Sequence, residues 1–428
     1  MLLLHLSDIH FRSSDVGSAQ DPNFALRNEL LRDCEAMCRQ VGGSPDAVIV
    51  SGDIAYAGKK AEYDFATKWL DALTTACGAS LREVFVCPGN HDVDRAIAGR
   101  QINQILHRAI KDTPDVGQMA FIQGLLQDDG PSRFLYEPLD AYNLFAGQFL
   151  CDLKAPERTR AVRNLKLNDG STLRLWALNT AFVSSAADKR GDLFVDNAAL
   201  NLPREAGVEN VAVFHHPAGW LRNGQDLTDH LNSVARLQLS GHEHLGRVEQ
   251  NLRSLKLRAS AAHPDRHEPN WAPGYNLIEL HVEGAGDDRL LRVKVHARIW
   301  NPATQRFQVS QSDVGGLVWE QTIALEAWRP TQPQETDDVQ VPLGEPEDNV
   351  SDAAMTNIRE IGIQFYSLSF SKKNEIAGRL GLLEDDDLNQ PDFERFRRVF
   401  LRAHERGQLP ALEAAIRDAS NPNQTQVI

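Results

Sequence analysis

Short runs of apolar residues alternate with amphipathic stretches from Met1 to about residue 300. Several runs contain Val, Ile and Leu without polar alternation, which is typical of strands that are covered on both faces. The amphipathic stretches Phe24–Val41 and Ala61–Ala76 have the spacing of helices. This alternation predicts a layered α/β domain. The apolar runs are Leu2–Leu6, Ala47–Val50, Val84–Val86, Leu173–Leu178, Val211–Phe214 and Arg236–Leu239.

The segment Arg95–Leu150 interrupts this rhythm, because its composition is mostly helical and it holds few strand signals. We interpret residues 95–150 as a helical insertion that lies over the active site of the α/β domain. From Tyr275 to about Gln311 the pattern turns to strands again, which we expect at Asn276–Val282, Leu291–Trp300 and Arg306–Gln311.

The last hundred or so residues have a different composition. Trp328–Asn349 is rich in Pro, Gln, Asp and Glu, which bury little apolar surface, so this segment is predicted to be a linker. In Ser351–Arg417 apolar residues recur at helical spacing, and we expect a small helical bundle with one helix capped by Ser371. The predicted domains are therefore residues 1–327, a linker at 328–350, and residues 351–428.

Composition narrows the class of protein. The chain has 428 residues, 42% hydrophobic and 24% charged, which indicates a globular protein of two domains. No apolar run approaches the roughly 20 residues that span a bilayer, and Met1–Leu6 is too short for a signal sequence. We therefore expect a cytoplasmic protein that does not associate with membranes. The five cysteines form no CxxC pair and indicate neither a disulfide framework nor a zinc–thiolate site.

Five short polar motifs follow the predicted strands, at the edge where open α/β sheets bind ligands. Alternate residues of an extended chain point the same way, so a D-x-H or H-x-H pair can send both side chains into one pocket. Each motif alone is also consistent with an ordinary turn, and it is their joint occurrence that favours a metal site. The motifs are Asp8-Ile9-His10, Gly52-Asp53, Gly89-Asn90-His91-Asp92, His215-His216-Pro217 and Gly241-His242-Glu243-His244.

A pair of divalent ions needs hard oxygen and imidazole ligands and at least one carboxylate that bridges them. The motifs supply such a set without thiolates. Histidine and carboxylate suit manganese, iron and zinc alike, so we expect two divalent ions of this group as cofactors. The candidate metal ligands are Asp8, His10, Asp53, Asn90, His215, His242 and His244.

These motifs, in this order, resemble those of the calcineurin-like metallophosphoesterase superfamily over about Met1–Val309. The nearest branch is that of the cyclic-nucleotide phosphodiesterases, through Leu6-Ser7-Asp8-Ile9-His10 and His215-His216-Pro217. The resemblance implies an α/β fold with a four-layer αββα sandwich, followed in this chain by the small all-α bundle.

The resemblance also implies roles for individual residues. Asp53 would bridge both metals together with a hydroxide. His91 would protonate the leaving oxygen or steady its charge, and Asp92 is a candidate to orient His91. Arg12 and Arg95 lie close to metal motifs in the sequence. They are candidates to contact the substrate phosphate, and the alternative is that both are ordinary surface arginines. The remaining ligands would be Asp8, His10 and His244 for the first metal, and Asn90, His215 and His242 for the second.

The implied activity is that of a metal-dependent phosphodiesterase or phosphohydrolase. Two cations lower the pKa of a bridging water and neutralise phosphate oxygens as the hydroxide attacks. The substrate stays open among a cyclic nucleotide, another small diester and nucleic acid, so nuclease activity is included. The net charge of −14 disfavours a general grip on nucleic acid but does not exclude a local basic groove. An alternative from another class is a partner-binding module whose metal centre is vestigial.

The C-terminal segment resembles the effector-associated domains of bacterial conflict and signalling proteins, which are small death-fold-like adaptors. The resemblance rests on Leu368-Ser369, on residues 375–382, and on residues 396–400 followed by 404–409. It implies a protein partner for residues 351–428 and coupling of the enzyme to a signalling or defence system. The alternative is a helical appendage that packs on the enzyme or forms a homo-oligomer.

Overall fold

The structure is a computed structural model that describes residues 1–428 except 20, 197–199, 266–270, 311–317, 331–351 and 421–428. Its contacts divide the chain into two compact units. The first, which we call the α/β unit, comprises Met1–Tyr142 and Leu153–Gln332, and the second, the helical unit, comprises Asn143–Asp152 and Pro333–Ile428.

The first sheet of the α/β unit has the strand order β12-β11-β10-β1-β2-β3, with β13 paired to β11. Strands β1, β2 and β3 run parallel and are buried along their whole length, which explains why the sequence shows them as unbroken apolar runs. The strands are β1 (Leu2–Leu6), β2 (Ala47–Ser51), β3 (Val84–Cys87), β10 (Gly274–Glu283), β11 (Leu290–Asn301), β12 (Arg306–Val309) and β13 (Trp319–Ala324).

The second sheet has the order β4-β5-β6-β7-β9-β8. Its central strands β5, β6, β7 and β9 are parallel, and the edge strands β4 and β8 are antiparallel to their neighbours. Arg163 of β4 donates to the Val84 carbonyl of β3 at 3.3 Å, which links the two sheets. The strands are β4 (Arg160–Lys166), β5 (Thr172–Leu178), β6 (Val208–Val213), β7 (Ala235–Ser240), β8 (Arg247–Gln250) and β9 (Leu255–Arg258).

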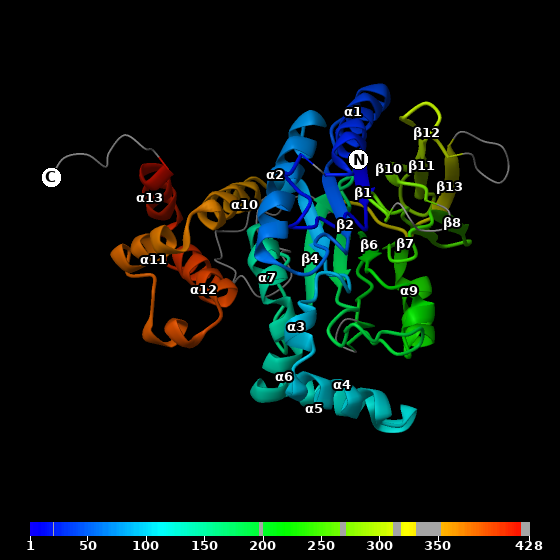
Figure 1. The fold of residues 1–428 in the computed structure, drawn as a ribbon. Coiled ribbons are helices and arrows are strands. Elements are labelled where there is room, and N and C mark those ends of the chain that lie inside the picture. The colour runs from blue at the N-terminus through cyan, green and yellow to red at the C-terminus, as the bar shows by residue number, and fades with distance from the viewer. Residues whose placement is uncertain (20, 197–199, 266–270, 311–317, 331–351, 421–428) are drawn as a thin grey trace. The chain divides into compact units, whose positions relative to one another are not determined.

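Helices flank the sheets of the α/β unit (Figure 1). Figure 1 shows α1 (Phe24–Val41) and α2 (Lys60–Ala76) beside β1 and β2, and α9 (Gly224–Val234) beside β7. The short 3-10 helices η1 (Leu81–Glu83) and η4 (Ala218–Trp220) precede β3 and α9. The predicted α/β class is confirmed.

Residues 95–150 form a series of short helices. They are α3 (Arg95–Ala98), α4 (Gln101–Asp112), α5 (Asp115–Gln127), α6 (Asp129–Tyr136), η2 (Glu137–Leu139), α7 (Asp140–Ala146) and η3 (Gly147–Phe149). The last part of this region, Asn143–Asp152, belongs to the helical unit.

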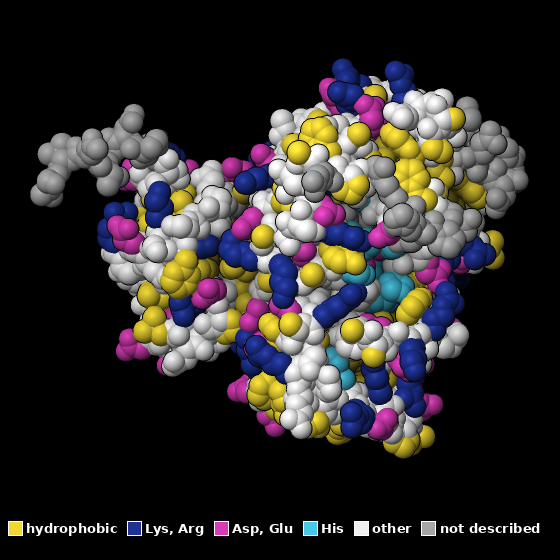
Figure 2. All heavy atoms as spheres, in the orientation of Figure 1, with side chains coloured by type: hydrophobic (Ala, Val, Ile, Leu, Met, Phe, Trp, Pro, Cys, Tyr) yellow, Lys and Arg dark blue, Asp and Glu magenta, His cyan; other side chains and the backbone are white. Residues whose placement is uncertain are grey.

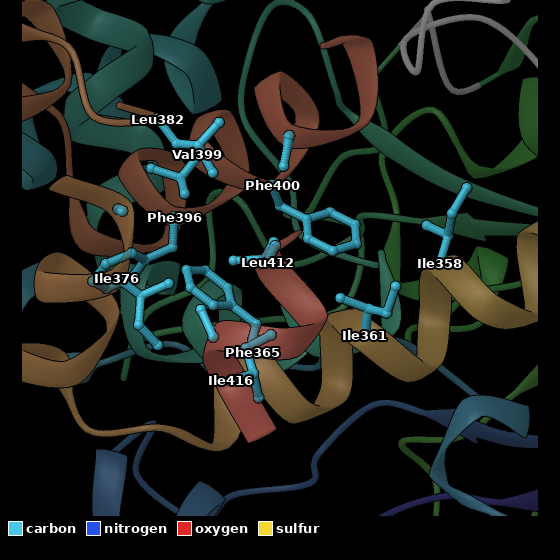
Figure 3. Packing of buried hydrophobic residues seen from close by; sticks show 13 residues of the cluster. Ile358, Ile361, Phe365, Ile376, Leu382, Phe396, Val399, Phe400, Leu412 and Ile416 are labelled. Carbon is cyan, nitrogen blue, oxygen red and sulfur yellow. The ribbon is translucent and has the colours of Figure 1, made fainter. Parts of the chain in front are cut away.

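The helical unit is built around one apolar core (Figure 3). Figure 3 shows Phe365, Phe396, Phe400 and Leu412 close together, and all four side chains are fully buried. The prediction that Ser371 caps the second helix is wrong, because the side chain of Ser369 accepts the cap bond instead. The elements are α10 (Asp352–Ser367), α11 (Phe370–Arg379), η5 (Asp385–Asn389), α12 (Asp392–Glu405) and α13 (Leu409–Ser420).

The segment Asn143–Asp152 is an integral part of the helical unit. Leu144 and Leu150 pack against its core, and a Cβ atom at Gly147 would lie only 3.0 Å from the ring of Tyr366. Asp152 is almost fully buried, and its carboxylate pairs with Arg397 of α12 at 2.7 Å. The helical unit therefore includes residues that precede β4 in the sequence.

The domain boundaries predicted from composition remain a proposal. Most of the predicted linker at 328–350 lies outside the described residues. Within the part of the chain that the structure describes, no helix is long and apolar enough to cross a membrane.

The Asp152–Arg397 pair gives a test of the helical unit. Asp152→Ala leaves a mostly buried guanidinium without this partner, which we expect to lower the free energy of unfolding by about 3–5 kcal/mol. The matched control is Glu413→Ala, which removes an exposed pair with Arg417 and should change stability by less than about 1 kcal/mol. Urea denaturation followed by circular dichroism measures both, and equal effects would contradict a structural role for Asp152.

Candidate metal centre

The seven candidate metal ligands lie together beyond the ends of the strands that carry them. On the first side, His244 Nε2 lies 3.3 Å from Asp8 Oδ1, and His10 Nε2 lies 3.1 Å from Asp53 Oδ2. The ligand atoms of Asp8, His10 and His244 all lie within 4.8 Å of one another. This arrangement has the donors and the spacing that one divalent ion requires.

The second side shares Asp53 with the first. His215 Nε2 lies 3.2 Å from Asp53 Oδ2 and 3.2 Å from Asn90 Oδ1. His242 Nδ1 lies 3.0 Å from Asn90 Oδ1 and 3.3 Å from His215 Nε2. One oxygen of Asp53 therefore faces ligands of both sides, which is the position that a bridging carboxylate needs.

The backbone at the ligands adopts the left-handed region, which is uncommon for residues other than glycine. Among the described residues, seven that are not glycine have positive φ, and five of them are candidate ligands. Such conformations cost about 1–3 kcal/mol each and persist only where the surrounding structure enforces them. The five are Asp8 (φ 52°), His10 (52°), Asp53 (54°), His242 (73°) and His244 (58°).

Two glycines allow the ligand loops to approach each other closely. A Cβ atom at Gly89 would collide with Asp53 Oδ1 and would lie 2.8 Å from the ring of His215. At Gly241 it would collide with Ser7 Oγ and lie 2.7 Å from Asp8 Oδ2. Close packing of the loops, more than a sharp turn, therefore requires glycine at these positions.

Hydrogen bonds orient the His215 ring. Its Nδ1 faces the Ser51 carbonyl at 2.9 Å and carries the proton of that bond, so Nε2 is the atom that faces Asp53 and Asn90. A hydrogen bond from the ring nitrogen that does not bind the metal fixes the orientation of a metal-binding imidazole.

The charges in the site suit cations. Burial would raise the pKa values of Asp8 and Asp53, but neighbouring histidines outweigh it and hold both below their usual range. Burial would lower the pKa of His215, but Asp53 and Asp8 outweigh it and raise it to about 9. Asp8 Oδ1 is buried, and within the part of the chain that the structure describes it forms no hydrogen bond of ordinary geometry, with His244 Nε2 at 3.3 Å as an ionic neighbour. Two buried carboxylates surrounded by imidazoles fit bound metal ions.

Comparison with known proteins agrees with this geometry. Residues 1–246 match the family described as "Calcineurin-like phosphoesterase", and residues 357–418 match the "GTPase-associated adaptor domain". The chain belongs to the calcineurin-like phosphoesterase family. The family resemblance and the predicted C-terminal adaptor are thus confirmed, the latter as a GTPase-associated adaptor domain.

The phosphoesterase is similar to two curated proteins. An "Uncharacterized metallophosphoesterase-like protein YydB" of Bacillus subtilis (strain 168) is 24% identical over 252 residues, which are 56% of this chain and 48% of that protein. The "Glycerophosphodiester phosphodiesterase GpdQ" of Enterobacter lignolyticus (strain SCF1) is 37% identical over 92 residues, 22% of this chain and 30% of that protein. The chain thus matches about half or less of the length of these relatives.

Two solved structures illustrate the similarity of this chain to known folds. The Vps29 protein of Entamoeba histolytica complexed with Zn²⁺ has 13% sequence identity and a TM-score of 0.30 over 76% of this chain and 99% of that one. A putative 5'-nucleotidase from Staphylococcus aureus has 12% identity and a TM-score of 0.34 over 84% of this chain and 58% of that one.

His91 of the phosphoesterase lies beside the first side of the centre, with its ring 4.7 Å from that of His10. Its Nδ1 donates to the Tyr56 carbonyl at 2.7 Å, so in the neutral ring Nε2 carries the lone pair. Burial lowers the pKa of His91 to about 4, although the charge of Asp53 opposes the shift. Donation of a proton from Nε2 to a leaving group therefore requires the protonated, positively charged ring. An approaching anionic substrate would favour that form.

Asp92 contacts the backbone of the ligand loops. Among the described residues its carboxylate forms no hydrogen bond with the His91 ring. Asp92 is fully buried and links the two ligand loops, so a role in orienting His91 stays a prediction. Its carboxylate accepts hydrogen bonds from the backbone N–H groups of Gly89, Ile54 and Ala55 and from the hydroxyl of Tyr63.

Three residues near the centre were not predicted as part of it. His263 is buried, with Nδ1 2.8 Å from the Ile9 carbonyl. Trp220 packs edge to face against His242, with ring centroids 4.2 Å apart. Thr180 holds the Nδ1 of His216 at 2.9 Å. The contact partners of these residues are distant in sequence, so no local pattern indicates them.

The crowding at Gly89 predicts the effect of a single methyl group. Gly89→Ala displaces Asp53 and His215, and we expect it to weaken metal binding by at least about tenfold, since bound ions depend on ligand geometry. The control is Gly43→Ala, where a Cβ atom has no neighbour within 4 Å. Metal titration by calorimetry measures both variants, and unchanged affinity in Gly89→Ala would contradict the proposed ligand set.

Proposed function

We propose that this phosphoesterase is a dinuclear-metal phosphodiesterase. The observation that carries the proposal is the position of Asp53, because its Oδ2 lies 3.1 Å from His10 Nε2 and 3.2 Å from His215 Nε2. That oxygen lies between two groups of ligands, each with the donors for one divalent ion. The proposal is further supported by similarity to a protein named as a glycerophosphodiester phosphodiesterase.

Each residue of the proposed centre has a separate role toward the substrate phosphate. When bound, two divalent ions lower the pKa of a water molecule and neutralise phosphate oxygens. Asp8, His10 and His244 would hold the first ion, and Asn90, His215 and His242 would hold the second. His91, beside His10, faces the leaving oxygen and supplies a proton from its Nε2. Asp92 keeps the Asp53 and Asn90 loops in register.

A second hypothesis holds that the chain only binds a partner and that its metal centre is vestigial. The geometry disfavours it, because all seven ligands are present and five hold the left-handed backbone that brings them together. Strain of this kind is retained where a site uses it.

Turnover of bis-p-nitrophenyl phosphate with added manganese tests the proposal. We expect Asp53→Asn and His91→Ala each to lower kcat by at least about 100-fold, because one removes the bridging charge and the other the proton donor. The control is the surface variant Lys60→Ala, whose exposed side chain pairs only with Asp64 among the described residues. Wild-type protein that binds manganese but does not turn over this diester would contradict the proposal.

We further propose that the helical unit recruits the phosphoesterase to a protein partner. Its match to a GTPase-associated adaptor domain supports this role. Phe370 and Leu388 are apolar yet 48% and 55% exposed, and both flank Arg395, whose guanidinium lies over the Phe370 ring and donates to the Leu388 carbonyl. Exposed apolar side chains around an arginine are typical of the centre of a protein interface.

Charged substitutions in the full chain test recruitment. We expect Phe370→Glu and Leu388→Glu to reduce co-purification of the native partner by about tenfold or more, because they place a carboxylate in an apolar contact. Leu252→Glu, at a leucine of the α/β unit that is 96% exposed, is the control. Hydrolysis of the small diester should be the same in all three. Undiminished co-purification in both adaptor variants would argue against this surface.

A further inference from the structure

Arg95 differs from the other cations around the metal centre. Its Nη2 lies 3.2 Å from Nε2 and 3.3 Å from Nδ1 of His91, so the guanidinium covers the imidazole ring. Among the described residues Arg95 has no carboxylate partner, whereas Arg12 pairs with Asp265 at 3.0 Å and Lys59 with Asp94 at 2.7 Å. An exposed guanidinium without a carboxylate is available to an anion.

A second excess of positive charge lies beside the other side of the centre. Arg190 pairs with Glu243, the residue between His242 and His244, and Arg258 pairs with the same carboxylate. Arg247 and Arg258 in turn share Glu249, at 3.2 and 3.9 Å. Among the described residues, three guanidinium groups thus pair with two carboxylates, which is an excess of one positive charge.

The arginines on both sides accompany aromatic rings. The Arg190 guanidinium lies 5.6 Å from the centroid of Trp220, whose ring contacts His242. On the His91 side, Arg12 lies 3.9 Å from the centroid of Tyr56, and the Tyr56 ring lies 5.0 Å from that of His91. Cations interleaved with aromatic rings are typical of surfaces that bind single-stranded nucleic acid.

Figure 2 shows the histidine side chains in a hollow of the α/β unit, with Lys and Arg side chains on its rim. The two excess charges flank different ligand groups, because His91 groups with His10 and Asp53, and His242 with His215 and His216. A substrate phosphate held at the centre therefore has a cation available on either side of it.

We propose that Arg95 and Arg190 bind the phosphates that flank the scissile diester of a single-stranded oligonucleotide. The inference rests on the proposed function and names its substrate class. A diester with one phosphate gives these arginines nothing to bind, whereas a strand presents a further anion in both directions. The net charge of −14 does not oppose the inference, because the excess positive charge is local to the rim.

The experiment compares two substrates in four proteins. We measure kcat/KM with manganese for a short single-stranded oligodeoxynucleotide and for bis-p-nitrophenyl phosphate, in wild type, Arg95→Ala, Arg190→Ala and Arg292→Ala. The last is the matched control, an arginine of β11 with a half-exposed side chain that pairs with Glu283. Binding of the labelled oligonucleotide, followed by fluorescence anisotropy at several salt concentrations, provides a readout independent of turnover.

We expect the ratio of the two kcat/KM values, oligonucleotide over small diester, to fall about tenfold in Arg95→Ala and in Arg190→Ala. The salt dependence of binding should weaken by about 0.7 in logarithmic slope for each lost phosphate contact. Arg292→Ala should match wild type in both measurements. The ratio separates this effect from any influence of Arg95 on His91, because both substrates share that histidine.

Two results would overturn the inference while leaving the proposed function intact. One is turnover of the small diester by a protein that neither binds nor cleaves the oligonucleotide. The other is a ratio and a salt slope that stay at the wild-type values in both rim variants. Failure of the metal-loaded protein to turn over the small diester would instead count against the proposed function, and anisotropy would still decide whether the rim binds a strand.

Discussion

The placement of the Asp53 carboxylate is the constraint on which the α/β unit depends. One of its oxygens faces His10 and His215, and the other accepts the backbone N–H of His91 at 2.7 Å. The backbone carbonyl of Asp53 accepts hydrogen bonds from the N–H groups of Ile9 and His10 at 2.8 and 3.0 Å. Asp53 thereby connects several of the ligand loops, and the parallel strands β1, β2 and β3 bring these loops to one edge. A buried carboxylate in this position requires neighbouring positive charge to offset the cost of its burial. Protonated histidines supply part of this charge, and bound metal ions would supply the rest.

Much of this site could be predicted from local sequence. The apolar runs before Asp8, Asp53 and Asn90 mark buried parallel strands, and polar residues directly after such strands share an edge. The helix Phe24–Val41 has the bounds that its periodicity indicates. Strand β4, by contrast, was not predicted, because it is only half-buried and carries Arg, Asn and Lys among its apolar residues.

The residues that support the ligands could not be predicted, because their contacts are distant in sequence. His263 is buried by its bond to the Ile9 carbonyl, and Asp92 is directed toward the Ile54 and Ala55 N–H groups and away from its neighbour His91. Asn143–Asp152 contributes to the helical unit through Leu150 and Asp152, whose partners lie far along the chain. Packing between distant segments leaves no periodic signal in either one.

The composition of the helical unit limits how the adaptor can be separated from the enzyme. Deletion of residues 351–428 would remove the partners of Leu144, Leu150 and Asp152 and expose apolar surface next to β4 in the sequence. A loss of activity in such a deletion would therefore have a structural explanation as well as a regulatory one. Surface substitutions in the full chain keep the two apart.

In the proposed centre, Asp53 would join two metal ions. Electron paramagnetic resonance of the manganese-loaded protein tests it most directly, because two ions that share a bridging ligand are magnetically coupled. We expect a coupled signal from two manganese ions per chain, and its replacement by the signal of an isolated ion in Asp53→Asn. An uncoupled signal from a single ion in the wild-type protein would contradict it.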